Sequence, residues 1–381
     1  MTPYEVSQLS NLLSTKGRKA KMNRLTAPYK GITRYAGVPT EQLTGRLHYN
    51  ENLYGPSPLC FETLKNVTPE DISLYESGPR DDLVDAISEK FSIPVENIFT
   101  GNGSAENIKS IISIFTKEGD TVLLPDPGWS YYTGLANYKF LHVELYPILE
   151  EDGLCKHDIA TIREKAEKDH PKIIIITSPA MPTGNKIADE DLEAIIKDFP
   201  DSLILVDEAY FGFAEYKLDV NRIIHTYDNV IFSRTFSKYY GLANLRLGYG
   251  FCSEELRKIL WLDLPLHRLP HICKRMAIAA LQDTAYYEKI TAELLESRDQ
   301  FIATLNTLPR VHAYPSSANF IYISLTNYDV RKIKAAAEEH GYLIRIFTGN
   351  NQEHLRITIG TKDLMEDLTA FMLKEIPEAA L

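Results

Sequence analysis

The chain has 381 residues, of which 44% are hydrophobic and 24% are charged. This is the composition of an ordinary globular protein, and it excludes a disordered chain, a collagen and a coiled-coil rod. The formal net charge of −11 argues against nucleic acid or a membrane surface as the main partner, because neutralising many phosphates needs a basic face.

The cysteines and the apolar runs narrow the class further. The four cysteines lie far apart without a Cys-x-x-Cys pair, so we expect neither a metal site nor a disulfide framework. No apolar run reaches the ~18 residues that a membrane span requires. The first positive charges follow the N-terminal apolar residues, which is the reverse of a secretory signal. We therefore predict a cytoplasmic protein.

Short apolar runs alternate with amphipathic stretches over residues 46–265, which predicts a large α/β domain. Two runs, 173–176 and 203–206, are continuously aliphatic and are typical of strands covered on both faces of a mainly parallel, doubly wound sheet. The predicted strands are 97–100, 121–124, 141–146, 172–177, 202–206, 230–233 and 246–251. The predicted helices are 80–91, 104–115, 157–168, 189–198 and 254–262.

The pattern changes after this domain, and residues 266–381 predict a smaller α+β unit. Residues 270–308 form one long helical stretch with interruptions, and strands at 319–324, 342–347 and 354–358 alternate with helices at 330–340 and 362–374. Residues 1–45 find no strand partner in the large domain. We interpret them as an arm or as part of the smaller unit.

Three of the predicted strands are followed by residues that could carry chemistry, because ligands of α/β sheets bind beyond the carboxyl ends of the strands. Gly101-Asn-Gly-Ser104 precedes a helix and could cradle an anion or form a plain capped turn. Asp207 could be a helix cap, and Lys238 a surface residue. Together with Arg246 and nearby hydroxyls, they supply an amine for a Schiff base, a carboxylate and a phosphate site.

These residues resemble the lysine motif of the fold type I, pyridoxal-phosphate-dependent aminotransferases of class I/II. The resemblance rests on Ser233-Arg-Thr-Phe-Ser-Lys238 with Gly241-Leu-Ala-Asn-Leu-Arg246-Leu-Gly-Tyr249. It extends in the family's order over residues 50–58, 101–104, 179–184, 205–210 and 355–360. Within the family, the resemblance is greatest to the histidinol-phosphate aminotransferases, through residues 50–58, 235–238 and 25–29.

The resemblance implies a pyridoxal 5′-phosphate cofactor and a role for each matching residue. Lys238 would hold the cofactor as a Schiff base and move a proton at the substrate Cα, and Asp207 would pair with the pyridine nitrogen. Tyr210 would donate to the ring's phenolic oxygen, and Trp129 would stack on the ring. The phosphate would be held by Ser104, Ala105, Thr235 and Arg246, and by Tyr75 of a neighbouring subunit in a homodimer. Substrate would contact Arg356, through its carboxylate, and Tyr29, Asn52 and Arg345.

Met181 departs from the family pattern, which has an asparagine that donates to the ring's phenolic oxygen. A thioether cannot donate a hydrogen bond, and hydrogen bonds to a charged group favour that charged form. We therefore expect the bound cofactor to titrate at a higher pH than in typical relatives. Replacing Met181 with asparagine should lower the apparent pKa in a visible-wavelength pH titration, and an unchanged or raised value would contradict the hypothesis.

Three functions remain open on the sequence. The first is transamination between an L-amino acid, or an amino phosphate ester such as histidinol phosphate, and a 2-oxo acid. The second is an amino-acid decarboxylase, cyclase or oxidase, because the same lysine, aspartate and arginine serve all of these reactions. The third is a regulatory module on the same scaffold, which the presence of Lys238 and Asp207 disfavours.

Overall fold

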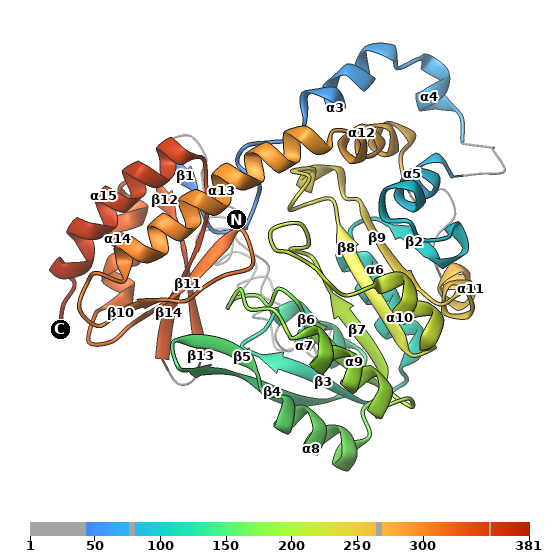
Figure 1. The fold of residues 1–381 in the computed structure, drawn as a ribbon, viewed down its shortest axis with the longest axis horizontal. Helices are drawn as coiled ribbons and strands as arrows, with labels where there is room; N and C mark the ends of the chain where they lie inside the picture. Colours follow the sequence, from blue (N-terminus) through green and yellow to red (C-terminus); the bar gives the residue numbers. More distant parts are fainter. Residues whose placement is uncertain (1–42, 76–80, 264–268, 350–351) are drawn as a thin grey trace, which may run out of the picture.

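The structure is a computed structural model that describes residues 43–75, 81–263, 269–349 and 352–381 (Figure 1). Its largest element is an eight-stranded sheet in the order β2-β9-β8-β7-β6-β3-β4-β5. Strands β8, β7, β6, β3 and β4 run parallel to one another, whereas β9 and β5 are antiparallel to their neighbours. This confirms the predicted mainly parallel α/β sheet.

The strands of this sheet lie close to the predicted ranges. They are β2 (Ile98–Gly101), β3 (Thr121–Asp126), β4 (His142–Glu151), β5 (Leu154–His157), β6 (Ile173–Thr177), β7 (Leu203–Asp207), β8 (Val230–Thr235) and β9 (Gly248–Cys252). The sequence analysis missed β5, which forms an antiparallel hairpin with β4. Its exposed, buried, exposed, buried pattern is that of a half-covered edge strand and is too short to be distinctive.

Helices cover both faces of the sheet, and alternate residues of the central strands show this directly. Ile174 and Ile204 pack in one apolar cluster with residues of α5, α8, α9, α10 and α12. Their neighbours Ile173 and Leu203 pack in another cluster with residues of α6, α7 and α11. Because side chains alternate across a strand, a strand buried on both sides is aliphatic throughout, as predicted.

The helices of this part are α5 (Asp82–Phe91), α6 (Ser104–Phe115), α7 (Ser130–Tyr138), α8 (Ile159–Asp169), α9 (Asp189–Asp198), α10 (Val220–Thr226), α11 (Glu254–Asp263) and α12 (His271–Gln282). Before them, α3 (Pro58–Glu62), a 3₁₀ turn at Thr63–Asn66 and α4 (Pro69–Ser73) project from the body beside α12 (Figure 1). Further 3₁₀ turns lie at Val95–Asn97 and Ala243–Leu245. Helices α7 and α10, which the sequence analysis missed, are short.

The second unit is a four-stranded antiparallel sheet in the order β10-β11-β14-β13 with its own apolar core. Its strands are β10 (Val311–Ala313), β11 (Phe320–Leu325), β13 (Arg345–Gly349) and β14 (Gln352–Thr358), and its helices are α13 (Thr284–Leu305), α14 (Val330–Glu339) and α15 (Lys362–Glu378). Strand β1 (Gly45–Arg46) pairs in parallel with β12 (Tyr342–Leu343), so this part of the N-terminal segment completes the smaller unit.

Two helices connect the units. Helix α12 packs in a core cluster of the large sheet although the sequence analysis assigns residues 266–381 to the smaller unit. Residues Tyr287 and Ile290 of α13 lie in that same cluster, whereas Leu294 and Phe301 lie in the core of the small sheet. The sequence pattern of a helix does not indicate which core the helix packs against. The domain boundary between residues 265 and 266 therefore stays a prediction. Among the described residues, no helix is long and apolar enough to cross a membrane.

Candidate active site

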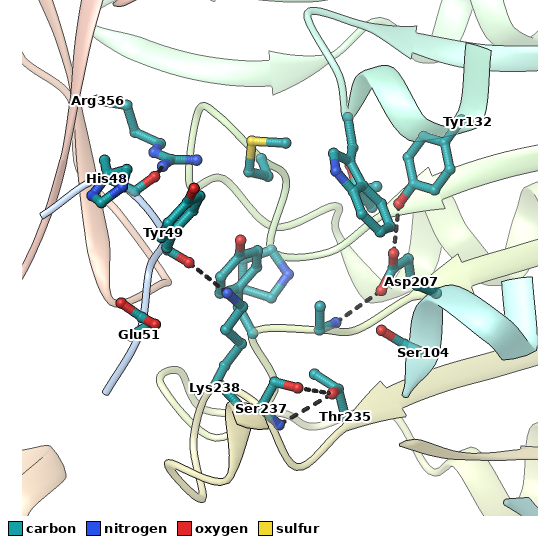
Figure 2. Close-up of a pocket in the computed structure, with 18 of the residues that line it drawn as sticks. His48, Tyr49, Glu51, Ser104, Tyr132, Asp207, Thr235, Ser237, Lys238 and Arg356 are labelled. Carbon is teal, nitrogen blue, oxygen red and sulfur yellow. Dashed lines mark hydrogen bonds between the residues drawn. The ribbon is translucent and has the colours of Figure 1, made fainter. Parts of the chain in front are cut away.

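A pocket lies where the carboxyl ends of the central strands meet the smaller unit. Strands β6, β7 and β8 each contribute their last residue to its wall, namely Thr177, Asp207 and Thr235. The opposite wall comes from the segment around His48 and from Arg345 and Arg356 of the small sheet. Figure 2 shows Asp207 and Ser104 on one side of the pocket, Arg356 and His48 on the other, and Lys238 between them. Parallel strands end at one edge of a sheet, which explains this convergence.

Lys238 lies in the loop after β8, and its Nζ donates a hydrogen bond to the carbonyl oxygen of Tyr49 at 2.6 Å. Burial, assisted by the positive charge of Arg356, lowers the pKa of Lys238 from 10.5 to about 8. A lysine with a lowered pKa is neutral in a larger fraction of molecules and is therefore a better nucleophile and base near neutral pH. The structure thus provides an activated amine at the centre of the pocket.

Asp207 is buried at the end of β7, where two groups of the chain hold its carboxylate. The hydroxyl of Tyr132 donates to Oδ2 at 2.5 Å, and the backbone N–H of Ala209 donates to Oδ1 at 3.0 Å. Burial raises the pKa of Asp207 to about 6, although both hydrogen bonds act to lower it. A carboxylate fixed in this way at the base of a pocket can pair with a protonated ring nitrogen.

An anion cradle forms around the first turn of α6. Gly103 has φ +86°, and a Cβ there would collide with the guanidinium of Arg246. A Cβ on Gly248 would likewise collide with the backbone nitrogen of Ser104. No side chain caps the N-terminus of α6, and its first two residues, Ser104 and Ala105, line the pocket. Helix N-termini with an arginine and hydroxyls are suited to bind phosphate.

The hydroxyls of this cradle are already ordered by one another. The Thr235 hydroxyl donates to Ser237 Oγ at 2.9 Å and accepts a hydrogen bond from the backbone N–H of Ser237 at 3.1 Å. Arg246 Nη1 lies 3.4 Å from the same Ser237 Oγ. Ser237 was not among the predicted site residues, although it stands directly before Lys238 in the lysine motif.

Two arginines form the far wall of the pocket. Arg345 on β13 and Arg356 on β14 are direct partners in the antiparallel ladder, so their side chains leave the same face of the sheet. The guanidinium of Arg356 lies against the rings of Phe320 and Phe347 and donates to the carbonyl oxygen of His48. Burial, assisted by the positive charges of Arg345 and Arg356, lowers the pKa of His48 to about 4.

The structure brings together ten of the site residues predicted from the sequence. They are Ser104, Ala105, Trp129, Asp207, Tyr210, Thr235, Lys238, Arg246, Arg345 and Arg356. Asn52 does not line the pocket, because its amide donates to the carbonyl oxygen of Tyr239 and accepts from the backbone of Tyr54. Tyr75 is 78% exposed and lies beyond α4, away from the pocket. Tyr29 lies outside the described residues.

Four residues that the sequence analysis missed also shape the site. Tyr132 is the clearest case, because it stands three residues after Trp129 and both contact the same pocket. Trp129 is the N-cap of α7 and Tyr132 lies in the first turn of that helix, and this closeness in the chain is the signal that the sequence offered. His48, Tyr49 and Thr177 line the pocket as well. Thr177 ends a predicted strand, so the rule on strand ends could have found it, whereas nothing in the local pattern of His48 and Tyr49 marks them.

The side chains that line the pocket fit pyridoxal phosphate. The cofactor needs an amine for its aldehyde, a carboxylate for its ring nitrogen, a donor for its phenolic oxygen and a cradle for its phosphate. Lys238, Asp207, Tyr210 and the first turn of α6 are of these types and line one pocket. The hydroxyl oxygen of Thr177 is buried there without a hydrogen-bond partner, as expected for a wall completed by a ligand. Within the described part of the chain, no cluster of side chains could hold a metal ion.

This fold and this set of side chains define a pyridoxal-phosphate-dependent transferase. The chain matches the family model "Aminotransferase class I and II" over residues 46–371, and it belongs to that family. It is therefore a pyridoxal-phosphate-dependent aminotransferase, which confirms the class of enzyme, the fold and the cofactor that the sequence predicts.

Individual relatives agree with the family. Histidinol-phosphate aminotransferase from Methanococcus maripaludis strain C5 is 31% identical over 335 residues, which are 87% of this chain and 89% of that protein. The crystal structure of histidinol-phosphate aminotransferase from Sinorhizobium meliloti with pyridoxal-5′-phosphate is similar with a TM-score of 0.82 at 22% identity, covering 91% and 96% of the two chains. L-threonine-O-3-phosphate decarboxylase from Porphyromonas gingivalis is similar with a TM-score of 0.74 at 20% identity, covering 86% and 98%.

Proposed function

We propose that this aminotransferase acts on an amino phosphate ester of the histidinol phosphate type and on a 2-oxo acid. The observation that carries the proposal is the pair Arg345 and Arg356, which project from directly opposed positions of β13 and β14 at the far wall of the pocket. A phosphate dianion is matched better by two guanidinium groups than by one. The 2-oxo acid must use the same pocket in turn, and its carboxylate suits the same arginines.

The cofactor would be held by residues on the opposite wall. Arg246, Ser104, Thr235 and the N–H groups of α6 would bind its phosphate, and Asp207 would bind its ring nitrogen. When bound, pyridoxal phosphate supplies an electron sink that stabilises negative charge at the substrate Cα. The residues of the chain then have to orient the substrate and move its proton.

Lys238 is the group that would move this proton. Its amine lies between the carboxylate of Asp207 and the arginine wall (Figure 2), and its pKa of about 8 suits both removal and return of a proton near neutral pH. The carbonyl oxygen of Tyr49, which accepts its hydrogen bond in this structure, would orient the amine once substrate has freed it. Arg356, whose guanidinium lies near two aromatic rings, would fix the distance of the substrate from this base.

The test compares half-reactions of phosphorylated and unphosphorylated amines. Histidinol phosphate should convert the bound cofactor at lower concentration than histidinol, and 2-oxoglutarate should restore the starting spectrum. Replacing Arg345 with glutamine should raise the KM for histidinol phosphate roughly 10- to 100-fold, as expected for a lost charged hydrogen bond, and change that for histidinol little.

Arg331 provides the matched control, because it is an exposed arginine on α14 that pairs with Glu353. Its glutamine variant should keep the KM of the unaltered enzyme. An equal rise in KM for histidinol phosphate and histidinol in the Arg345 variant would contradict phosphate recognition by this residue. Release of carbon dioxide from amino-acid substrates, detected by product mass, would instead establish the decarboxylase alternative.

We also propose that the enzyme is a homodimer, on the support of an apolar surface on α3, α4 and the 3₁₀ turn between them. Large hydrophobic side chains are 40–78% exposed there, namely Leu59, Phe61, Leu64, Ile72, Leu74 and Tyr75. Several large exposed apolar side chains within one short segment are typical of an interface, and a second copy of the chain is the commonest partner. The cytoplasmic location stays a prediction from the sequence.

Mixed dimers test the role of Tyr75. If Tyr75 reaches the cofactor of its partner, a dimer of one Lys238→Ala subunit and one Tyr75→Phe subunit contains one unaltered site. At limiting cofactor, the mixture should then be more active than the mean of its two parents. Activity equal to that mean would count against the intersubunit role, and size-exclusion chromatography of the unaltered chain would report the dimer itself.

A further inference from the structure

Asn50 is held in one orientation by contacts on three sides. It is 1% exposed and has φ 54°, a left-handed conformation that asparagine adopts more readily than most residues. Its backbone N–H donates to Thr358 Oγ1 at 3.0 Å, and its carbonyl oxygen accepts from Asn319 at 3.1 Å. Its side chain connects Thr358 of β14 with Tyr210, which follows β7.

The hydrogen bonds of Asn50 Oδ1 and Nδ2 show which end of its amide faces Tyr210. The Thr358 hydroxyl accepts from the Asn50 backbone N–H and has one hydrogen of its own, which it donates to Asn50 Oδ1 at 3.0 Å. The carbonyl end of the amide therefore faces Thr358. The remaining end, Nδ2, carries only hydrogens, so it must donate to Tyr210 Oη, from which it is 2.9 Å away.

This donation determines where the Tyr210 proton can lie. A phenol hydroxyl has a single hydrogen, and the oxygen lone pair facing Asn50 is occupied, so the hydrogen points away from Asn50. The Tyr210 ring is held edge-on against Phe320 with centroids 4.9 Å apart, and Tyr210 lines the pocket. A hydroxyl whose oxygen accepts one hydrogen bond also becomes a stronger donor through its own hydrogen.

Met181 makes the direction of the Tyr210 proton important for the cofactor. It lines the same pocket at the position where the family pattern has a donor, and its thioether cannot donate. Tyr210 then carries the donation to the phenolic oxygen of the cofactor without that second donor.

We propose that Asn50 is a positioning residue that directs the hydroxyl proton of Tyr210 to the phenolic oxygen of the cofactor. The inference rests on the role that the resemblance implies for Tyr210, as the donor to that oxygen in the proposed aminotransferase. Asn50 itself would not touch substrate or cofactor. Its anchor, Thr358, lies two residues from Arg356 on β14, so the strand that would bind substrate also orients the donor to the cofactor.

The experiment is a visible-wavelength pH titration of the purified, cofactor-loaded enzyme. Asn50→Ala removes the donor to Tyr210, and we expect the apparent pKa of the bound cofactor to rise by about half a unit to one unit, the size of one hydrogen bond. Asn50→Asp places an acceptor beside Tyr210 and would draw its proton out of the pocket. It should therefore raise the apparent pKa at least as far as Tyr210→Phe.

Two further variants separate positioning from general damage. Thr358→Val leaves Asn50 in place and removes the hydroxyl that orients its amide, so a smaller rise is expected. Asn97→Ala is the matched control, because Asn97 is a second buried asparagine. Its Nδ2 donates to the backbone carbonyl oxygen of Cys252 rather than to a tyrosine. It should leave the apparent pKa unchanged even if it lowers the melting temperature.

The double variant Asn50→Ala/Tyr210→Phe decides the question. If Asn50 acts through Tyr210, the double variant has the apparent pKa of Tyr210→Phe alone. Additive shifts, or no shift in any Asn50 variant while Tyr210→Phe shifts, would overturn the inference and leave the role of Tyr210 intact. No shift in Tyr210→Phe would overturn the role of Tyr210 and the inference together, without touching the test of the arginine pair.

Discussion

Replacing Lys238 with alanine should lower kcat by at least about 10⁴-fold, because the variant loses both its covalent attachment to the cofactor and its proton-transfer base. The pocket would otherwise be preserved, since Lys238 makes its hydrogen bond to a backbone carbonyl rather than to another catalytic side chain. Half-reaction spectra with the amino substrate measure the loss. Cofactor affinity measured separately should fall much less, because the phosphate cradle around α6 remains.

The pH dependence of cofactor attachment tests the same residue without altering it. Burial lowers the pKa of Lys238 to about 8, and only the neutral amine reacts with an aldehyde. Attachment to apoenzyme should therefore accelerate about tenfold per pH unit below pH 7 and level off above about pH 8. Borohydride reduction followed by peptide mapping should locate the adduct on Lys238. A rate that keeps rising to pH 10, or an adduct elsewhere, would contradict the assignment.

Much of the fold could be predicted because each central strand carries a local signal. The aliphatic run that became β6 is buried on both faces, so every position is apolar and the pattern is unmistakable. The segment that forms β5 is an edge strand of four residues buried on one face, in which alternation is too short to distinguish a strand from a loop. The assignment of α12 to a core depends on tertiary contacts, which no local pattern records.

Some site residues could likewise be predicted from the local sequence, whereas others depend on contacts between distant segments. Asp207 and Lys238 follow strands, so their convergence follows from the rule that ligands bind beyond the carboxyl ends of parallel strands. Asn50 contacts Tyr210 across 160 positions of sequence, and its side-chain role depends on the orientation of a hydroxyl on β14. In the sequence, Asn50 is marked only as the first residue of the motif at residues 50–58. Its contacts became visible only when both units were placed together.

Replacing Asp207 with asparagine should lower kcat by about 10³-fold, which corresponds to ~4 kcal/mol of lost charge interaction with a protonated ring nitrogen. Asparagine keeps the shape of the side chain; its oxygen can accept from the Ala209 N–H, and its amide nitrogen can donate to the Tyr132 hydroxyl, so the change is mainly one of charge. Tyr132→Phe is the graded comparison, because it removes one donor to the carboxylate and leaves its charge. We expect it to lower kcat only about 10-fold.

The charge of Asp207 also makes cofactor affinity depend on pH with a defined sign. Burial raises the pKa of Asp207 to about 6 in the cofactor-free chain, so the carboxylate is protonated below that pH and ionised above it. Affinity for pyridoxal phosphate should therefore increase as the pH rises through about 6, and Asp207→Asn should abolish that increase. The Lys238 amine ionises near pH 8, two units away, so the two effects can be separated in one titration. If the asparagine variant kept the increase at pH 6, another group would have to supply the charge, and the pairing of Asp207 with the ring nitrogen would be wrong.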